Sequence, residues 1–461
     1  MFSPRPACGA SNCHVLPSPR VRGEGPGVRG FGIGSTNMWL GGSRGVLLTD
    51  GKRLTMISRC NWAAVLVLAC LPASAAELGP VKPPALAVTG PKPKPVVAPT
   101  DQEIEKAIRR GVEFLLKRQN GNGSWGAARN TPGGVNLYAP VPGAHHGFRA
   151  ATTSLCVSAL IETGGDRPEV AEAIDRAEAW MFENLPHLRR AEPEAIYNTW
   201  GHAYSIQALV KLLQRRADDP DRQRRIRPLI QQQIELLGRY ECVDGGWCYY
   251  DFDYRTQKPG GSSISFVTAT VLVAFDEARQ AGFQVPDRLI QRAVASIRRQ
   301  RKPDFSYCYG EYLKYQPMLD VNRPGGSLGR SQACNLAMRL WGDPLVTDDV
   351  VKTWLDRLFA RNLWLDLGRK RPIPHESWFA VAGYFFYYGH YYAGRCIELL
   401  PADERAPFQD RLAHVLVPLQ EKDGSWWDYM MYDYHQQYGT AFALMSLARC
   451  RRAVTDGSTG H

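Results

Sequence analysis

The sequence predicts an all-α fold in which six helical hairpins close into a ring, with apolar helices as an inner barrel and amphipathic helices around them. Three observations predict this arrangement. Apolar residues recur at helical spacing through residues 101–450. Half-exposed segments alternate there with segments that are apolar nearly all round. A motif that joins a helix end to a Gly-x-Trp turn also recurs, and self-similarity of this kind indicates a repeat architecture.

The amphipathic segments are expected to form the outer ring, because each has one apolar and one charged face. They cover about 101–118, 168–183, 228–239, 286–301, 347–360 and 407–419. Four of them begin at a proline, which suits the first helical turn because its missing N–H needs no partner there. These prolines are Pro168, Pro228, Pro286 and Pro407.

The apolar segments are expected to form the inner barrel, since a helix without a polar face must be covered on most sides. They cover about 151–162, 201–214, 263–279, 330–341, 378–398 and 438–450. An open solenoid is the alternative, but it needs two polar terminal caps and the sequence shows none. The last helix, around Gly439 to Leu447, is therefore expected to pack against the first pair.

The N-terminal region predicts export. Residues 1–55 lack any sustained period and are interpreted as a spurious or disordered extension, with translation starting at Met56. Arg59, the apolar run 62–71 and the small residues before Ala76 are typical of a signal peptide at 56–75. Acylation at Cys70 is the alternative. We expect a periplasmic or extracellular protein without a transmembrane helix, because the run is too short to span a bilayer.

A Pro-rich linker is expected at 76–100, and a disordered tail at 451–461, on either side of the repeat domain at 101–450. Residues 1–75 carry 8 Lys/Arg and 2 Asp/Glu, so their removal leaves 48 basic and 43 acidic residues and lowers the net charge from +11 to +5. Without a clustered basic stripe we expect no nucleic-acid partner. Cys242 and Cys248 flank one turn, and whether they form a disulfide stays open.

The recurring motif has a Gln, three spacers and Gly-x-Trp after a helix end. Its copies run Gln119 to Trp125, Glu241 to Trp247 and Gln420 to Trp426, with a decayed copy from Gln300 to Tyr307. The motif resembles the QW repeat of the prenyltransferase/squalene oxidase repeat family, found in terpenoid cyclases of the squalene-hopene and oxidosqualene type. The resemblance implies an α/α toroid, which protein prenyltransferase β-subunits share. It implies a structural role for the Gln (or Glu) and Trp of each copy.

The chemistry of that family does not carry over directly. Such cyclases place an Asp-x-Asp-Asp acid before a helix that begins Thr-Ala, whereas the corresponding positions before Thr440-Ala441 hold Gln436, Tyr438 and Gly439, none of which is an acid. Whether the chain is an enzyme is therefore left open. The prenyltransferase zinc site implies Asp, Cys and His ligands, for which Asp244, Cys248 and His435 are the one weak candidate set. The Asp-to-Cys spacing is wrong for it, so we expect no zinc and predict no cofactor.

The turns that follow the motifs combine aromatic residues with carboxylates, and in a toroid they share one end. Asp251, Asp253, Asp433 and His435 are the candidate catalytic residues. The candidate cavity rim consists of Tyr254, Glu311, His375, Glu376, Trp378, Trp427 and Asp428, together with tyrosines between Tyr384 and Tyr392.

Three interpretations of this rim compete. Paired carboxylates divide acid and base roles in glycosidases, which would make the protein a carbohydrate-active enzyme. Aromatic faces stabilise cations, which favours a cavity that binds or transforms an apolar, isoprenoid-like ligand. In the third interpretation the aromatic residues only pack the loops. A separate alternative class is a non-catalytic module at the cell envelope that offers the aromatic rim to a protein or glycan. The isoprenoid-like ligand is the leading hypothesis; the oligomeric state stays open.

Overall fold

The computed structural model describes residues 82–129, 142–192, 194–251, 258–375 and 380–451, which all belong to the second of the chain's two units, Ala75–His461. The predicted extension, signal peptide and tail lie outside the described residues, as do four candidate site residues. These four are Asp253, Tyr254, Glu376 and Trp378.

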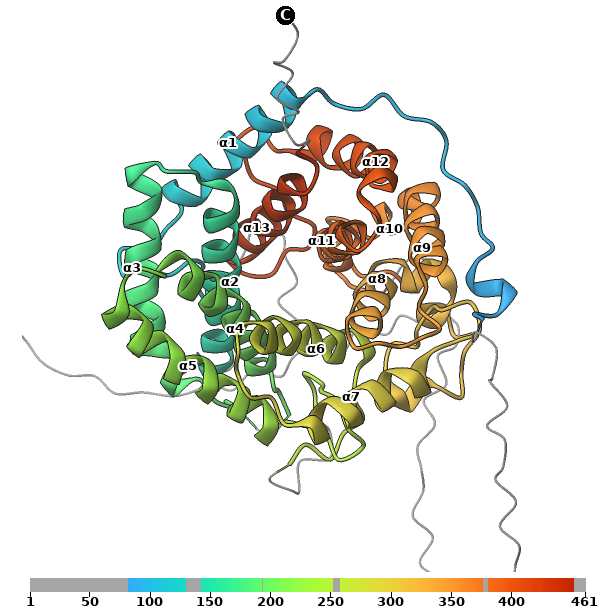
Figure 1. The fold of residues 1–461 in the computed structure, drawn as a ribbon, viewed down its shortest axis with the longest axis horizontal. Coiled ribbons are helices and arrows are strands. Elements are labelled where there is room, and N and C mark those ends of the chain that lie inside the picture. The colour runs from blue at the N-terminus through green and yellow to red at the C-terminus, as the bar shows by residue number, and fades with distance from the viewer. Residues whose placement is uncertain (1–81, 130–141, 193, 252–257, 376–379, 452–461) are drawn as a thin grey trace, which may run out of the picture. The chain divides into compact units, whose positions relative to one another are not determined.

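The second unit is an all-α toroid of six hairpins, each with one outer and one inner helix (Figure 1). The outer helices are α1 (Asp101–Lys117), α3 (Pro168–Asn184), α5 (Pro220–Arg239), α7 (Asp287–Gln300), α9 (Asp348–Ala360) and α12 (Ala406–Leu416). The inner helices are α2 (Pro142–Thr163), α4 (Asn198–Arg215), α6 (Ser265–Gln280), α8 (Pro324–Leu340), α11 (Phe385–Glu398) and α13 (His435–Ala448).

Short elements fill the connections. They are α10 (Asn362–Asp366) and the 3-10 turns η1 (Ala85–Ala87), η2 (Leu185–His187), η3 (Glu311–Leu313), η4 (Asp320–Asn322), η5 (Ala402–Glu404) and η6 (Val417–Leu419). The described residues contain isolated β-bridges but no named strand. None of the described helices combines the length and apolar character that a bilayer crossing needs.

The inner helices contact one another in chain order, and α13 packs against α2 and α1. The ring is therefore closed, as the apolar character of the last helix predicts. Inner helices such as α6 are buried along nearly their whole length, whereas the outer helices bury one face. The predicted division into an inner barrel and an outer ring is confirmed.

Helix starts differ most from the prediction in four places. The outer helix expected to start at Pro228 begins at Pro220 instead, so Pro228 lies inside α5. Asp219 caps this earlier start by accepting a hydrogen bond from the Arg222 N–H (3.0 Å), and this start signal outweighs the internal proline. Helices α2 and α8 start earlier than predicted, at Pro142 and Pro324, and α11 starts later, at Phe385.

The motif copies share one set of hydrogen bonds. The indole N–H of each motif tryptophan donates to a leucine carbonyl at the end of the preceding outer segment, at 2.8 Å in every copy. The pairs are Trp125 with Leu115, Trp247 with Leu237 and Trp426 with Leu416. A threonine hydroxyl of the next inner helix accepts from the tryptophan backbone N–H; these are Thr153, Thr268 and Thr440. Each motif thus ties an outer helix to the inner helix that follows.

The decayed copy keeps part of this geometry. Phe305 has a φ of 62°, in the left-handed region that Gly123, Gly245 and Gly424 occupy in the other copies. The Asp304 carboxylate accepts from the N–H and O–H of Ser306, as Asp423 does from Ser425. The turn therefore persists where the glycine and tryptophan have been replaced.

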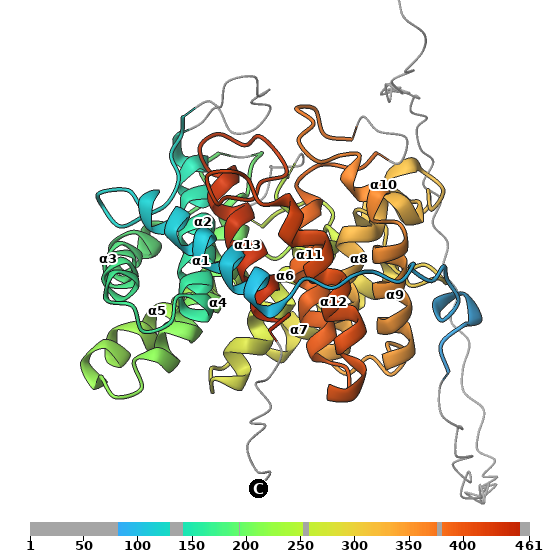
Figure 2. The ribbon, with the colours of Figure 1, turned by 90° about the horizontal axis from the view of Figure 1, so that it is seen from above.

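The part of the Pro-rich segment that the structure describes, residues 82–100, runs along the outer helices α9 and α12 (Figure 2). The Arg357 guanidinium donates to the carbonyl oxygens of Leu86 and Thr89, both at 2.6 Å. Lys92 forms an ion pair with Asp356, also at 2.6 Å. The segment ends at a capping box between Thr100 and Glu103, which starts α1.

Candidate functional site

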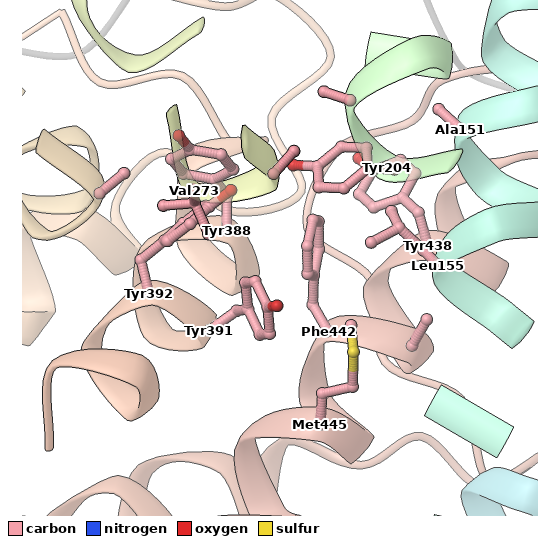
Figure 3. Packing of buried hydrophobic residues seen from close by; sticks show 14 of the residues in the cluster. Ala151, Leu155, Tyr204, Val273, Tyr388, Tyr391, Tyr392, Tyr438, Phe442 and Met445 are labelled. Atoms are coloured by element: carbon pink, nitrogen blue, oxygen red, sulfur yellow. The ribbon is translucent and has the colours of Figure 1, made fainter. Parts of the chain in front are cut away.

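The interior of the inner barrel contains a chamber of about 150 Å³, here called the deep chamber. Twelve of its sixteen lining residues are aromatic. The lining consists of Phe148, Ala151, Thr152, Leu155, Tyr197, Trp200, Tyr204, Tyr249, Phe266, Tyr384, Phe385, Tyr388, Tyr429, Met431, Tyr438 and Phe442. Figure 3 shows Tyr204, Tyr388, Tyr438 and Phe442 gathered in this interior. The chamber is therefore apolar, with phenol hydroxyls as its main polar groups.

The spacing of aromatic residues along the inner helices explains why these rings line the deep chamber. Trp200 and Tyr204 are four residues apart on α4, as are Tyr438 and Phe442 on α13, so each pair presents two successive turns to the interior. The rings of Trp200 and Tyr204 stack, with centroids 6.0 Å apart. Because the six inner helices face one another, side chains distant in sequence form one continuous aromatic wall.

A second, larger chamber of about 780 Å³, here called the outer chamber, shares Tyr249 and Tyr384 with the deep chamber. It is lined by Tyr249, Tyr250, Gly261, Ser262, Ile264, Tyr309, Tyr312, Leu313, Leu319, Asp320, Val321, His375, Ala380 and Tyr384. It is more polar than the deep chamber, because it includes an imidazole, a carboxylate and a serine. The two shared tyrosines form the boundary between the chambers.

His375 is hydrogen-bonded on both ring nitrogens. Nδ1 lies 2.7 Å from the carbonyl oxygen of Ala380, and Nε2 lies 3.0 Å from the hydroxyl of Tyr384. A carbonyl only accepts, so Nδ1 carries the proton in the neutral ring and Nε2 accepts from Tyr384. Burial lowers the pKa of His375, which the hydrogen bond to Ala380 opposes and the positive charge of Arg330 reinforces. The imidazole is therefore neutral at pH 7.

The backbone at this histidine is strained. His375 has a φ of 64° and Ala380 has a φ of 49°, both in the left-handed region that side chains with a Cβ rarely adopt. Strain of this kind persists only where the surrounding structure enforces it, and it is concentrated at functional sites.

Asp428 lies directly behind the wall of the deep chamber. Its carboxylate is buried and accepts hydrogen bonds from the Tyr438 hydroxyl and the Tyr387 N–H, both at 3.0 Å. Burial raises the pKa of Asp428 to about 7, although these two hydrogen bonds and Arg369 act in the opposite direction. Tyr438 itself lines the deep chamber, so a single phenol separates the Asp428 carboxyl group from the chamber.

Six side chains of alternating charge form a closed ring of ion pairs at the end of the barrel opposite the motif turns. The motif turns precede the N-termini of the inner helices, whereas these six side chains stand at or near the C-terminal ends. In order round the ring they are Glu162, Lys211, Glu277, Arg395, Glu398 and Arg449. Adjacent members are separated by 3.6, 3.6, 2.6, 3.3, 3.0 and, from Arg449 back to Glu162, 2.7 Å. Nothing in the sequence analysis predicted this ring.

Three of the predicted carboxylates are engaged in ion pairs. Asp251 is buried, pairs with Arg190 at 2.8 Å, and accepts from the Gly261 N–H at 2.9 Å. Glu311 pairs with Lys314 at 2.9 Å and with Arg299. Neither carboxylate lines the deep or the outer chamber. Asp433 lies near Arg118 and Arg129, at 3.5 and 3.7 Å, and is likewise absent from both linings.

Of the other predicted residues, His375 lines the outer chamber. Asp428 accepts a hydrogen bond from Tyr438, which lines the deep chamber. Trp427 and His435 contact each other edge to face, with ring centroids 5.3 Å apart, and Lys370 lies 4.4 Å from the Trp427 ring centroid. The structure brings His375, Tyr384 and Tyr388 to the cavity. It does not bring Asp251, Asp433 and His435 together there.

The residues of the weak metal candidate occupy separate environments. The Asp244 carboxylate accepts from the Ser263 N–H at 3.2 Å, and His435 Nδ1 lies 2.7 Å from the Tyr432 carbonyl oxygen. Cys248 Sγ lies 3.3 Å from Cys242 Sγ, and both cysteines are free thiols. Within the described ranges no three His, Cys, Asp or Glu side chains are grouped to hold a metal ion.

Sequence reasoning missed several lining residues, because it placed the site in the loops after each motif. Trp200, Phe266 and Phe442 come from inner helices, and none of them was a predicted site residue. For Trp200 and Phe442 a signal exists in the pairs Trp200/Tyr204 and Tyr438/Phe442, aromatic residues four apart on one face of an inner helix.

Comparison with known proteins gives only distant similarity. No family model matches the chain, and no curated protein matches it. Among solved structures it is similar to the type II terpene cyclase MstE from Scytonema, with 14% identity and TM-score 0.43 over 76% of this chain and 98% of that one. The GH76A alpha-1,6-mannanase from Salegentibacter sp. HEL1_6 gives 10% identity and TM-score 0.44 over 76% and 100%.

A sugar epimerase from a ruminal bacterium gives 12% identity and TM-score 0.45 over 75% of this chain and 98% of that one. At such identities and TM-scores these likenesses carry no argument about activity. The chain's own helices and cavity define its class, an α/α toroid with an aromatic central cavity.

Proposed function

We propose that the protein binds or transforms an apolar, isoprenoid-like molecule in its central cavity, without the Asp-x-Asp-Asp acid of squalene-hopene-type cyclases. The aromatic lining of the deep chamber carries this proposal. Burial of an apolar ligand against such a wall is favoured by the hydrophobic effect. The ring faces would also stabilise positive charge that develops on a bound hydrocarbon.

The size of the two chambers fits an elongated ligand with one polar end. A dry apolar cavity of about 150 Å³ accommodates a benzene-sized group. The deep chamber therefore holds one end of the ligand, and the remainder lies in the outer chamber of about 780 Å³. There a polar end would meet His375, Asp320 and Ser262.

The second candidate is a carbohydrate-active enzyme that uses the outer chamber, whose tyrosines could hold a sugar ring. Glycosidases need two carboxyl groups about 5–9.5 Å apart beside the scissile bond. In the described part of the chain, Asp320 is the single carboxylate that lines either chamber, and Asp251 is paired with Arg190. This observation favours the apolar ligand over a sugar.

A titration separates the two candidates. Purified protein is titrated with farnesol and with cellotetraose in an isothermal calorimeter. We expect saturable binding of farnesol and loss of that binding in Ala151→Phe, because Ala151 lines the deep chamber and the new ring fills it. The control is Ala179→Phe, which adds the same ring at an exposed position of the outer helix α3. Binding of cellotetraose alone would contradict the proposal.

We also propose that the protein is exported through the signal peptide at 56–75. The composition of that segment supports the proposal. N-terminal sequencing of protein recovered outside the cytoplasm tests it. A first residue near Ala76 is expected, and a protein that retains Met1 would contradict it.

A further inference from the structure

The deep chamber contains two phenols, each hydrogen-bonded to a titratable side chain. Tyr384 donates to Nε2 of His375 at 3.0 Å, and Tyr438 donates to Oδ1 of Asp428 at 3.0 Å. Both phenols line the deep chamber. Tyr388, another phenol of the same wall, instead has its hydroxyl 3.0 Å from the carbonyl oxygen of Phe266.

The two phenols belong to one neighbourhood. Tyr429, which also lines the deep chamber, lies between them. Its ring contacts that of Tyr384 edge to face with centroids 5.6 Å apart, and its carbonyl oxygen lies 3.4 Å from the Tyr438 hydroxyl. The two hydrogen-bonded pairs therefore share Tyr429 as a neighbour, on the wall that both phenols line.

We propose that these pairs form a proton-transfer site, in which Tyr384 with His375 acts as the base and Tyr438 with Asp428 acts as the acid toward an apolar ligand that carries a carbonyl group. The inference rests on the proposed function, because it requires an apolar ligand in the cavity. Tyr384 and Tyr438 are the catalytic residues, since they face the ligand. His375 and Asp428 are positioning residues that act through them.

The proton transfers balance within the site. The Tyr384 oxygen takes a proton from the carbon next to the ligand carbonyl while its own proton moves to Nε2 of His375. The electron pair of the broken C–H bond forms the C=C bond of an enol. Asp428 enters the reaction protonated, with its carboxyl proton turned toward the Tyr438 oxygen. Tyr438 donates its own proton to the carbonyl oxygen and takes the carboxyl proton in return, which leaves Asp428 as a carboxylate. The reverse transfers restore all four residues and return a proton to the same or a conjugated carbon.

Electrostatics support the direction of transfer. A base and an acid in one site need environments that move their pKa values in different directions from ordinary values. Burial lowers the pKa of His375, with Arg330 adding to this and the Ala380 hydrogen bond opposing it, so the ring is an unprotonated base. Burial raises the pKa of Asp428 to about 7, against the Tyr387 and Tyr438 hydrogen bonds and Arg369, so the carboxyl still holds a proton near neutrality.

The titratable and charged groups around His375 and Asp428 also affect their protonation. Tyr309 contacts the His375 ring edge to face at 5.6 Å, and its hydroxyl lies 3.5 Å from that of Tyr384. Around Asp428 the facing groups are Tyr387 on α11, Tyr438 on α13 and Arg369 after α10. None of these carries a carboxylate that would compete with Asp428 for the proton.

The test uses geranylacetone, an isoprenoid methyl ketone, as the probe. Protein and probe are incubated in deuterated buffer, and deuterium at the carbons beside the carbonyl is measured by mass spectrometry. Binding is measured separately by quenching of tryptophan fluorescence. Wild-type protein is expected to exchange these hydrogens well above the buffer rate, because a positioned acid or base typically contributes about 10²–10⁴-fold.

Each phenylalanine variant removes the hydroxyl oxygen of a single tyrosine. Tyr384→Phe and Tyr438→Phe are expected to lower the exchange rate by about 10²-fold or more while the probe still binds. Tyr315→Phe, at an exposed tyrosine outside both linings, is the matched control.

The pH profile distinguishes an acid–base role from a packing role. The wild-type exchange rate should rise through the lowered pKa of His375 and fall above about pH 7 as Asp428 ionises. His375→Gln should remove the rising limb, and Asp428→Asn should remove the falling limb. Probe binding without exchange above the buffer rate, or phenylalanine variants that exchange at the wild-type rate, would overturn this inference alone. Failure of the probe to bind would overturn the proposed function and this inference with it.

Discussion

The side-chain amide of Gln420 donates a hydrogen bond to the carbonyl oxygen of Ala107, with the two atoms 2.9 Å apart. Gln420 belongs to the last motif and Ala107 to the first outer helix, so this contact joins the two ends of the toroid. Arg110 of α1 completes it by donating to Oε1 of Gln420, also at 2.9 Å. Closure therefore depends on a specific polar contact as well as on apolar packing of α13.

Gln420→Ala should lower the free energy of unfolding by about 1–3 kcal/mol. The substitution leaves the carbonyl oxygens of Ala107 and Gly424 without the donor that now satisfies both. Urea unfolding monitored by circular dichroism measures the change. Gln102→Ala, at an exposed position of α1, is the control and should change the value by less than about 0.5 kcal/mol. Equal effects would show that the motif glutamine does not stabilise the ring.

Gly123→Ala should be more destabilising than Gly121→Ala, although both lie in the same turn. Gly123 has a φ of 88°, and a Cβ there would lie 2.3 Å from the carbonyl oxygen of Arg176, in the backbone of α3. The left-handed conformation alone costs an alanine about 1–2 kcal/mol. At Gly121 a Cβ would have no atom within 4 Å. Thermal unfolding of the two variants side by side decides this, and similar melting temperatures would contradict it.

The fold was predictable because its signals are local and repeated. A glycine that must adopt a positive φ and a tryptophan that caps a helix end leave a fixed spacing in sequence, as in Gly424 and Trp426. Pro228 shows the limit of such local signals. Its position suggested a helix start, but Asp219 and Pro220 together form a stronger one.

Lys211→Met should destabilise the fold at neutral pH by about 1–3 kcal/mol, because it removes one cation from two partly buried carboxylates, Glu162 and Glu277, which keep Arg449 and Arg395 as their other partners. Burial alone disfavours the Lys211 ammonium, but Glu277 and Glu162 raise its pKa, so it is charged in the native state. Lys106→Met, at an exposed position of α1, is the control. Chemical denaturation at pH 7 provides the values, and a loss no larger than in the control would contradict the role of the charge ring.

The pH dependence of the free energy of unfolding should reveal the raised pKa of Asp428. Its pKa in the folded protein is about 7, raised by burial above the ordinary aspartate value of 3.8. The folded state then binds more protons than the unfolded state between about pH 4 and pH 7, so stability falls as pH rises through this window. The slope contributed by one such group is at most about 1.4 kcal/mol per pH unit.

Asp428→Asn isolates this contribution. The variant should lose stability less steeply than the wild type between about pH 4 and pH 7, because it has no proton to release. The comparison is made by denaturant unfolding at several pH values, so that the other titrating groups cancel in the difference. Parallel curves for the two proteins would show that burial does not raise the pKa of Asp428.

The candidate site was less predictable than the fold, because it depends on contacts between distant residues. The sequence cannot reveal that Arg190 pairs with Asp251 and removes it from the cavity, since the two belong to different hairpins. It also cannot show that Tyr438 is hydrogen-bonded to Asp428. The aromatic residues around His375 in the sequence marked it as a candidate. Its hydrogen bond to Tyr384 is known only from the structure.

The central claim, that the aromatic cavity holds an apolar ligand, is tested most directly by extraction. Protein purified from its native source without detergent is extracted with organic solvent, and the extract is analysed by mass spectrometry. We predict an isoprenoid-like compound in stoichiometric amount in the wild type and in Ala179→Phe, and its loss from Ala151→Phe, in which the deep chamber is filled. Wild-type protein that is reproducibly free of any such compound, and that takes up none when it is offered, would contradict the account.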